Sequence, residues 1–481
     1  MKREFVINIL LLVVLNLLIK PLYIFGIDRT VQNVLGPDIY GGYYAALLNF
    51  VYLFQIVNDF GIQNYTAQHI SKHPKMLAKY FPQFLTLKGI LGIIFLLLVG
   101  IGGYLFGFRG ALIPIILLLA LNQIAISYLF YLRANIAAIG RYRVDSLLSV
   151  ADKALMIVLC GLCLWGLRGI IDFNVYWFIG AQLISILITI LIALMILRPH
   201  LKGLIFRISR PTLAVILRQS LPYALVLFLS TLFTRVDSVM IKRLLSDGDY
   251  EAGAYAAAFR LLETANMFAY MFAALLLPMF SRMFREDKEV KGLFKMSVGI
   301  LWSAGIGLTV VVLLYKQGIM TLLYNYATPY WGQLLGMLMM GFGASAVSFI
   351  LGALLLAKGE VRRINYLYLA GALLNILLNL WWIPSSHAYG AARATFITQI
   401  IMMVGAFYLV WKFVISDMSW KFIAKMLIYC LLAAIGYGVL WRYEMAELRP
   451  ILTICLTVIA LVISAWTLGF IPKISDFREY E

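Results

Sequence analysis

Residues 83–106 read QFLTLKGILGIIFLLLVGIGGYLF, and Lys88 is the one charged side chain in the run. An α-helix of about 20 apolar residues is long enough to cross the hydrocarbon core of a bilayer. Similar runs follow one another along the 481-residue chain, of which 63% is hydrophobic and 13% charged. Soluble domains average about 45–50% apolar and about 25% charged residues, so the sequence predicts an integral membrane protein.

The repeated apolar runs predict an all-α polytopic fold with about 14 transmembrane helices. Polar turns separate the runs, for example Gly36-Pro37-Asp38 and Pro384-Ser385-Ser386. The expected spans are residues 5–27, 41–62, 83–106, 111–132, 145–167, 174–197, 219–241, 252–277, 293–315, 332–357, 364–383, 390–411, 422–441 and 451–471.

The distribution of basic residues predicts the orientation of these helices. With the N-terminus in the cytoplasm, 24 of the 40 Lys and Arg residues fall in cytoplasmic segments and 8 fall on the opposite side. Short cytoplasmic loops carry an excess of Lys and Arg, so both termini are expected in the cytoplasm. The net charge of +18 then faces anionic membrane lipids and not nucleic acid, because each basic residue near that surface gains about 1 kcal/mol.

A short motif occurs twice and suggests an internal repeat. Gly42-x-Tyr44-Ala45-Ala46 opens one expected span, and Gly253-x-Tyr255-Ala256-Ala257 opens another. A period of six spans gives two six-helix lobes in the same orientation, with a central cleft between them. The expected domains are an N-terminal lobe at 1–200, a basic cytoplasmic linker at 201–218, a C-terminal lobe at 219–415, and two additional helices with a short tail at 416–481.

Motifs of soluble enzymes are missing from the sequence. No phosphate-binding G-x-x-x-x-G-K-[ST] loop is present, and His69 and His73 lack the Glu of a zinc-protease motif. The four cysteines lie inside apolar runs, and Asp247-Gly248-Asp249 has the composition of a turn. We therefore expect a protein that is not an enzyme and has no metal or cofactor, apart from coupling to H⁺ or Na⁺.

Ten charged side chains fall inside the expected spans, where charges are costly and mark function. We expect Lys88 to extend to the inner interface and Asp152 to form a packing pair with Lys153. The cations are Lys20, Lys88, Lys153, Arg235, Arg260 and Arg393, and the acids are Asp59, Asp152, Asp237 and Glu263.

Some of these residues are candidates for a substrate site in the cleft. Clustered cations with few matching acids suggest an anionic ligand, and we assign it to Lys20, Arg235, Arg260 and Arg393. Arg260 and Glu263 also have the spacing of a local ion pair. Candidate coupling or gating acids are Asp59, Glu263 and Asp237. Asn375 and Asn379 have the spacing either to meet sugar hydroxyls or to bond between helices.

Two stretches carry a family resemblance. LGPDIYGGYY at 35–44 and NDFGI at 58–62 resemble the Wzx-like O-antigen and capsule flippases of the multidrug/oligosaccharidyl-lipid/polysaccharide exporter (MOP) superfamily. The resemblance implies a bacterial inner-membrane protein that moves undecaprenyl-diphosphate-linked oligosaccharide to the periplasmic leaflet by alternating access. Such a protein serves surface polysaccharide biosynthesis, with polysaccharide polymerase machinery as a possible partner.

The resemblance also bears on the candidate cations. Related lipid II flippases use cavity arginines, several from the first and eighth helices, for the diphosphate. Lys20 and Arg260 lie in the matching spans, although a lysine offers a point charge and not a planar fork.

Two alternatives remain open. A cation-coupled multidrug exporter of the same fold would favour an acidic cleft, whereas the embedded cations outnumber the acids by 6 to 4. A membrane-embedded polymerase or ligase would need a larger outer domain than these short loops provide.

Overall fold

The computed structural model describes residues 2–62, 77–167, 169–200, 210–417, 420–442 and 450–470. These residues are almost entirely helical, in agreement with the predicted fold class. The chain forms two compact units, Met1–Gly253 and Ala254–Glu481, and α11 runs across the boundary between them. The predicted division at 201–218 stays a prediction.

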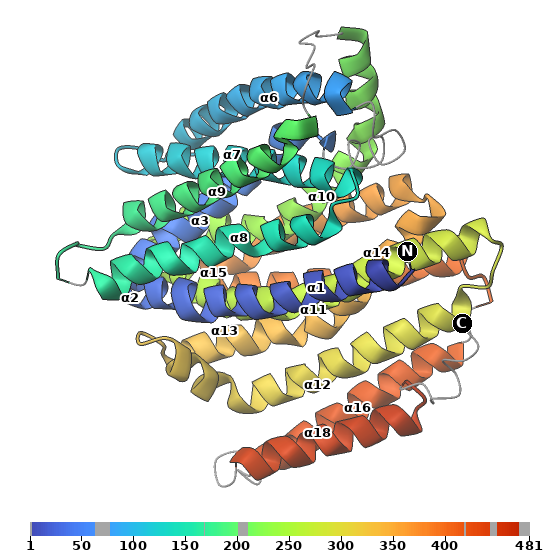
Figure 1. The fold of residues 1–481 in the computed structure, drawn as a ribbon. Helices are drawn as coiled ribbons and strands as arrows, with labels where there is room; N and C mark the ends of the chain where they lie inside the picture. The colour runs from blue at the N-terminus through green and yellow to red at the C-terminus, as the bar shows by residue number, and fades with distance from the viewer. Residues whose placement is uncertain are drawn as a thin grey trace. The chain divides into compact units, whose positions relative to one another are not determined.

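Unit 1 contains the described elements from α1 to α10 and the start of α11 (Figure 1). Several helices are interrupted by π-helical segments, labelled η1, η2 and η4, in which the hydrogen bonds are one residue longer. The elements are α1 (Lys2–Pro21), η1 (Leu22–Asp28), α2 (Arg29–Tyr40), η2 (Gly41–Ala45), α3 (Ala46–Tyr52), α4 (Gln55–Asp59), α6 (Leu77–Leu105), α7 (Leu112–Ala138), α8 (Tyr142–Gly161), η4 (Leu162–Gly166), α9 (Val175–Leu197), the 3₁₀ turn η5 (Arg198–His200), α10 (Arg210–Leu244) and α11 (Gly248–Arg285).

The described part of unit 2 consists of α-helices, most of them long. Its last two helices contact each other and α12, so they lie at one side of this unit. The elements after α11 are α12 (Lys291–Leu323), α13 (Pro329–Met340), α14 (Phe342–Lys358), α15 (Val361–Phe413), α16 (Trp420–Arg442) and α18 (Pro450–Thr467).

Candidate membrane spans can be counted from the length and apolar composition of the helices. In the described part of the chain, 10 helices are long and apolar enough to cross a membrane, and α18 contributes a shorter apolar helix. The 53-residue α15 counts once among them, although its backbone breaks at His387 (φ 54°, ψ −142°) into two arms. The break lies directly after the expected turn at Pro384-Ser385-Ser386. The full number of about 14 stays a prediction.

The first chain reversal occurs at the expected glycine–proline turn. Gly36 has φ 77° and ψ 164°, a conformation that a residue with a Cβ rarely adopts, and Pro37 begins the next helical stretch. The chain therefore reverses between the first two expected spans, as the sequence predicted.

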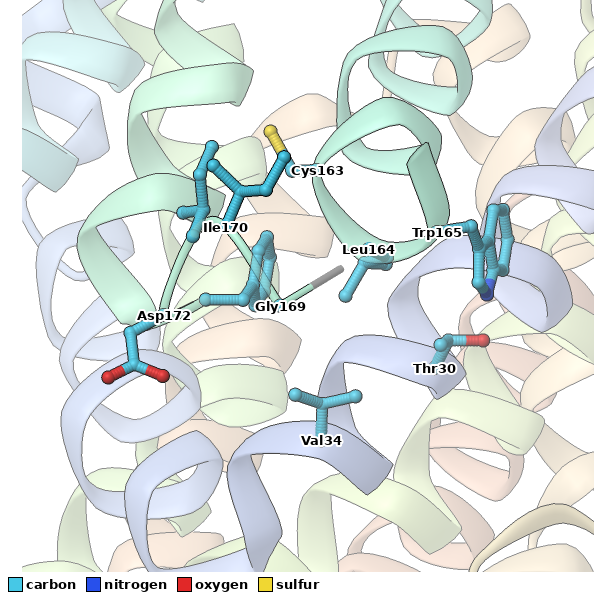
Figure 2. Close-up of a pocket in the computed structure, with 10 residues that line it drawn as sticks. Thr30, Val34, Cys163, Leu164, Trp165, Gly169, Ile170 and Asp172 are labelled. Atoms are coloured by element: carbon cyan, nitrogen blue, oxygen red, sulfur yellow. The ribbon is translucent and has the colours of Figure 1, made fainter. Parts of the chain in front are cut away.

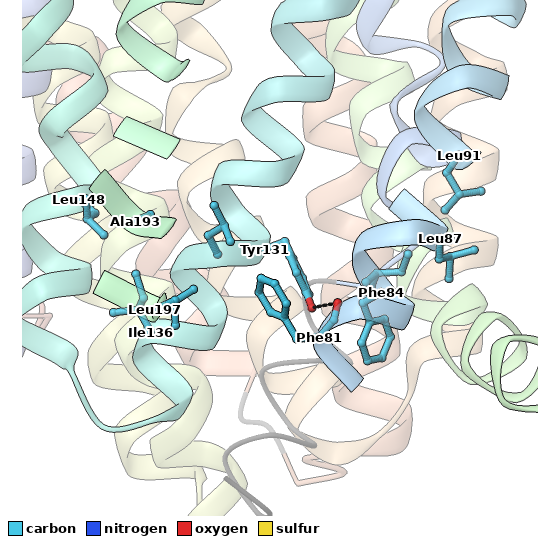
Figure 3. Packing of buried hydrophobic residues seen from close by; sticks show 11 residues of the cluster. Phe81, Phe84, Leu87, Leu91, Tyr131, Ile136, Leu148, Ala193 and Leu197 are labelled. Carbon is cyan, nitrogen blue, oxygen red and sulfur yellow. Dashed lines mark hydrogen bonds between the residues drawn. The ribbon is translucent and has the colours of Figure 1, made fainter. Parts of the chain in front are cut away.

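The core of unit 1 is built where four helices meet. Aromatic and aliphatic side chains from α6, α7, α8 and α9 interlock there, as Figure 3 shows. The Tyr131 hydroxyl donates a hydrogen bond to the Phe81 carbonyl oxygen at 3.2 Å, which satisfies a polar group that burial would otherwise penalise. The cluster comprises Ile62, Phe81, Phe84, Leu87, Leu91, Tyr131, Leu132, Ile136, Leu148, Ala193 and Leu197.

A glycine contact joins the beginning of α11 to η2. A Cβ added at Gly41 would stand 2.2 Å from the Gly253 backbone nitrogen, and one added at Gly253 would stand 2.2 Å from the Pro37 carbonyl oxygen. Gln32 Nε2 donates to the Gly253 carbonyl oxygen at 3.1 Å across this contact. We call these residues, Gln32, Pro37, Gly41 and Gly253, the glycine clamp. The first residue of the second motif copy thus packs directly beside the first copy.

Candidate functional site

Three of the embedded cations are neutralised by embedded acids. Lys88 Nζ lies 2.6 Å from Asp59 Oδ1, Lys153 Nζ lies 3.1 Å from Asp152 Oδ2, and Arg260 Nη1 lies 2.9 Å from Glu263 Oε2. Of the ten charges singled out in the sequence, Lys20, Arg235, Arg393 and Asp237 stand outside these three pairs. Three of these four residues are cations and one is an acid.

Lys88 corrects one expectation. Its side chain is 1% exposed, so it does not extend to the inner interface. Its ammonium bonds both Asp59 and Ser127, with the Ser127 hydroxyl at 2.7 Å. The sequence reading failed because the partner carboxylate lies 29 residues away, on another helix. Asp59, a candidate coupling acid whose side chain is 21% exposed, is therefore part of an ion pair, buried at its lysine, that joins α4, α6 and α7.

Lys20 lies on a polar seam between α1 and α8. Asn16 Nδ2 donates to Ser149 Oγ at 3.0 Å, and the Lys153 ammonium stands 5.1 Å from the centroid of the Tyr23 ring. Asp152, Lys153 and Arg133 act on Lys20 through their charges. In the part of the chain that the structure describes, no carboxylate lies within ion-pair distance of Lys20. Pro21 and η1 follow it directly, so the regular helical hydrogen bonding changes beside this cation.

Arg235 is held by α3. Its Nη1 lies 3.5 Å from Asn49 Oδ1, and its guanidinium stands 5.1 Å from the centroid of the Tyr52 ring. Two of its contacts are therefore to a neutral amide and an aromatic face, which orient the guanidinium. Asp237, two residues further along α10, is buried.

The other two candidate cations belong to unit 2. Arg260 forms its pair with Glu263 within α11, and both side chains are about one quarter exposed, at 26% and 23%. Arg393 is exposed, and its guanidinium stands 4.6 Å from the centroid of the Tyr389 ring. Lys20 and Arg235 lie in unit 1, so the convergence of all four cations on one cleft stays a prediction.

The two candidate sugar-binding asparagines are buried side by side on α15. Asn379 Nδ2 donates to Asn375 Oδ1 at 3.0 Å. The i,i+4 spacing thus produces a bond within one helix in this structure. A role with sugar hydroxyls stays a prediction.

Sequence reasoning missed two buried acids, Asp28 and Glu251. Asp28 is 1% exposed and accepts a hydrogen bond from the Tyr40 hydroxyl at 2.9 Å. Its position directly after an apolar run suggested a loop, whereas the helix continues through η1 into α2. The spacing of the polar residues Asp28, Gln32 and Tyr40 was a sequence signal for this. If the helix continues past residue 27, the three residues can lie on one face of it.

The fold identifies the general class of protein. The lipid II flippase MurJ in an inward closed conformation matches 96% of this chain and 98% of its own length, with a TM-score of 0.67 at 14% identity. An inward-facing multidrug resistance MATE family transporter matches 80% of this chain and 92% of its own, with a TM-score of 0.63 at 16% identity. A MOP superfamily transporter from Pyrococcus furiosus gives a TM-score of 0.61 at 16% identity, over 83% and 94% of the two chains. The protein therefore has the two-lobe MOP fold.

The family follows from the sequence. Residues 5–284 match the model of the polysaccharide biosynthesis protein family, and the chain belongs to this family. A comparison with curated protein sequences gave no match. The predicted superfamily is thus confirmed, and the protein is a multi-pass membrane protein of polysaccharide biosynthesis.

Proposed function

We propose that the protein is a flippase that moves undecaprenyl-diphosphate-linked oligosaccharide across the bacterial inner membrane by alternating access. The observation that carries the proposal is the combination of a polysaccharide biosynthesis family with the MOP fold over nearly the whole chain. A sugar assembled on a lipid in the cytoplasm must cross the bilayer before it reaches the cell surface. A protein of this family with this fold fits that step.

The embedded cations suit a diphosphate head group. A phosphate in a low-dielectric site costs many kcal/mol unless cations and hydrogen-bond donors compensate its charge. Arg235 offers a fork that aromatic and amide neighbours already orient, and Lys20 adds a point charge. Arg260 and Arg393 would complete the set in unit 2, while Asp59, Asp237 and Glu263 would serve in coupling or gating.

The second candidate is a cation-coupled exporter. The likeness to MATE transporters and the buried carboxylate of Asp28 favour it, because acids inside the spans of transporters mark ion pathways. A multidrug exporter would protect cells against cationic dyes, whereas a polysaccharide flippase would not.

Complementation of a host that lacks its own polysaccharide flippase tests the proposal. We expect restored surface polysaccharide and loss of the lipid-linked oligosaccharide stranded on the inner leaflet, with unchanged dye susceptibility. Restored dye resistance without surface polysaccharide would instead establish the exporter. A variant with both Lys20→Ala and Arg235→Ala, at normal protein level, is the matched control for the role of the cations.

A further inference from the structure

A cavity in unit 1 has none of the candidate cations among its lining residues. It has a volume of about 850 Å³ and lies between α2, η4 and the connection 169–173, as Figure 2 shows. Thr30 and Val34 reach it from α2, Cys163 and Trp165 from η4, and Asp172 from the connection. Pockets of about 300–1,000 Å³ are the usual size for small-molecule ligands.

The walls of the cavity are fixed by unusual local structure. One π-helical segment lines the cavity, since η4 supplies Cys163 and Trp165, and a second, η1, ends two residues before Thr30. The Thr30 hydroxyl donates to the Gly26 carbonyl oxygen at 2.6 Å, which anchors α2 to η1. A π segment is rare and is frequently found at functional sites. The π segment in the cavity wall therefore indicates a site that the fold maintains.

The connection that closes the cavity is held at both ends. At its start, the Ile170 and Ile171 backbone N–H groups donate to the Leu167 carbonyl oxygen, at 3.0 and 3.2 Å. At its end, Asn174 caps α9, with its Oδ1 accepting from the Tyr176 and Trp177 N–H groups at 3.0 and 3.3 Å. Asp172 thus projects from a short segment with two fixed ends, which suits a recognition group.

The side chains that line the cavity indicate which class of ligand it could bind. Asp172 is exposed, and among the described residues no cation lies within ion-pair distance of its carboxylate. An anionic group such as a phosphate would be repelled there. Trp165 is 57% exposed and offers an aromatic surface with an N–H donor, and Thr30 adds a hydroxyl oxygen. A ring with several hydroxyls on its edges and C–H groups on its faces matches this combination.

We propose that this cavity is a binding site for a neutral saccharide, with Asp172 accepting hydroxyl hydrogen bonds and Trp165 packing against a sugar ring. The proposal rests on the proposed function, because the saccharide would be part of the transported oligosaccharide. It assigns sugar recognition to residues of unit 1 that differ from the diphosphate cations and from Asn375 and Asn379. A polar wall with a carboxylate also makes the cavity a poor site for a lipid chain.

The free thiol of Cys163 gives a direct test, because this residue lines the cavity and is partly exposed. Full-length protein carrying Cys160→Ala, Cys430→Ala and Cys455→Ala is placed in lipid nanodiscs and treated with a water-soluble maleimide. Glucose, galactose and N-acetylglucosamine are added as probes, with glycine betaine as an osmotic control. At least one saccharide should slow the labelling of Cys163 in a saturable manner, and betaine should not. The Trp165 fluorescence, assigned by comparison with Trp165→Phe, should change over the same concentrations.

Two variants sharpen the test. Asp172→Asn should weaken protection about tenfold, as expected for loss of a hydrogen bond to a charged group. A protein with Ser385→Cys as its sole cysteine, in the exposed turn of α15, should label at the same rate with and without saccharide. If no saccharide changes either signal, or if sodium or an alkylammonium ion alone protects Cys163, the saccharide site is wrong. Binding is measured without transport, so that result would contradict the saccharide site and not the flippase proposal. Failed complementation with intact saccharide binding would contradict the flippase proposal and not the saccharide site.

Discussion

Two of the embedded ion pairs, one in each unit, neutralise charge in different ways. In unit 1, Lys88 and Asp59 come from different helices, and the lysine is fully enclosed. In unit 2, Arg260 and Glu263 are neighbours on one helix and remain about one quarter exposed. A pair between helices fixes their packing, whereas a pair within a helix can open without moving the backbone. The difference suggests that Lys88 serves structure and that Arg260 is available to a substrate.

The largest effect is expected for Lys88→Met. The substitution leaves the Asp59 carboxylate, which is 21% exposed, without its partner. An unsatisfied polar group in a largely buried place costs about 1–3 kcal/mol, and a charged group costs more. We expect a clear drop in thermal stability and in the yield of folded protein. The double variant Lys88→Met/Asp59→Asn should recover most of the loss. Wild-type stability in the single variant would show that this pair does not hold the helices.

The glycine clamp extends the comparison from charge to packing. A Cβ at Gly253 would collide with backbone, whereas one at Gly318 on α12 in unit 2 would meet nothing within 4 Å. Gly253→Ala should therefore destabilise the protein by about 1–3 kcal/mol, while Gly318→Ala should have little effect or stabilise slightly. Thermal unfolding of both variants in the same detergent measures the difference. Equal melting temperatures would contradict a rigid contact at Gly253.

Arg260 is expected to matter for transport more than for stability. Arg260→Ala should cost less than about 1 kcal/mol of stability, because the pair is partly exposed, yet abolish transport. Arg260→Lys should retain part of the activity, since it keeps the charge but loses bidentate geometry. The double variant Arg260→Ala/Glu263→Gln should fold and remain inactive. Full activity of that double variant would reduce Arg260 to a structural partner of Glu263.

The smallest effect on stability is expected for Glu286, on the surface directly after α11. Hydrogen bonds from Arg282 and then Lys288 lower the pKa of Glu286 to about 2. A lowered pKa in the folded state stabilises the protein above the ordinary value of 4.5, and this contribution is lost as the pH falls toward 2. Glu286→Gln should therefore be slightly less stable at neutral pH, with a difference that disappears in strong acid. Melting temperatures between pH 7 and pH 3 test this, and a difference that grows on acidification would contradict it.

The sequence predicted the helices well and their partners poorly. Hydropathy is a local property, so the run at 83–106 was sufficient to place a span where α6 lies. The enclosure of Lys88 depends on Asp59 and Ser127, which no spacing rule brings beside it. The π segments had no sequence signal, and without them Asp28 read as a loop residue and the cavity beside Trp165 could not be anticipated. Among the candidate cations, Arg260 could be paired from its spacing, whereas the contacts of Arg235 with Asn49 and Tyr52 needed the tertiary structure.

The glycine clamp also constrains the order in which the protein can assemble during its synthesis. Gln32 and Gly253 are 221 residues apart in the chain, so the ribosome must complete α10 before the residue that covers Gly41 exists. During that interval the surface of η2 that receives Gly253 stays uncovered in the nascent chain. A chain that stops before α11 would keep it uncovered permanently. The packing of unit 1 is therefore completed by the first residues of α11, the helix that continues into unit 2. The first helices are inserted before this final packing can take place.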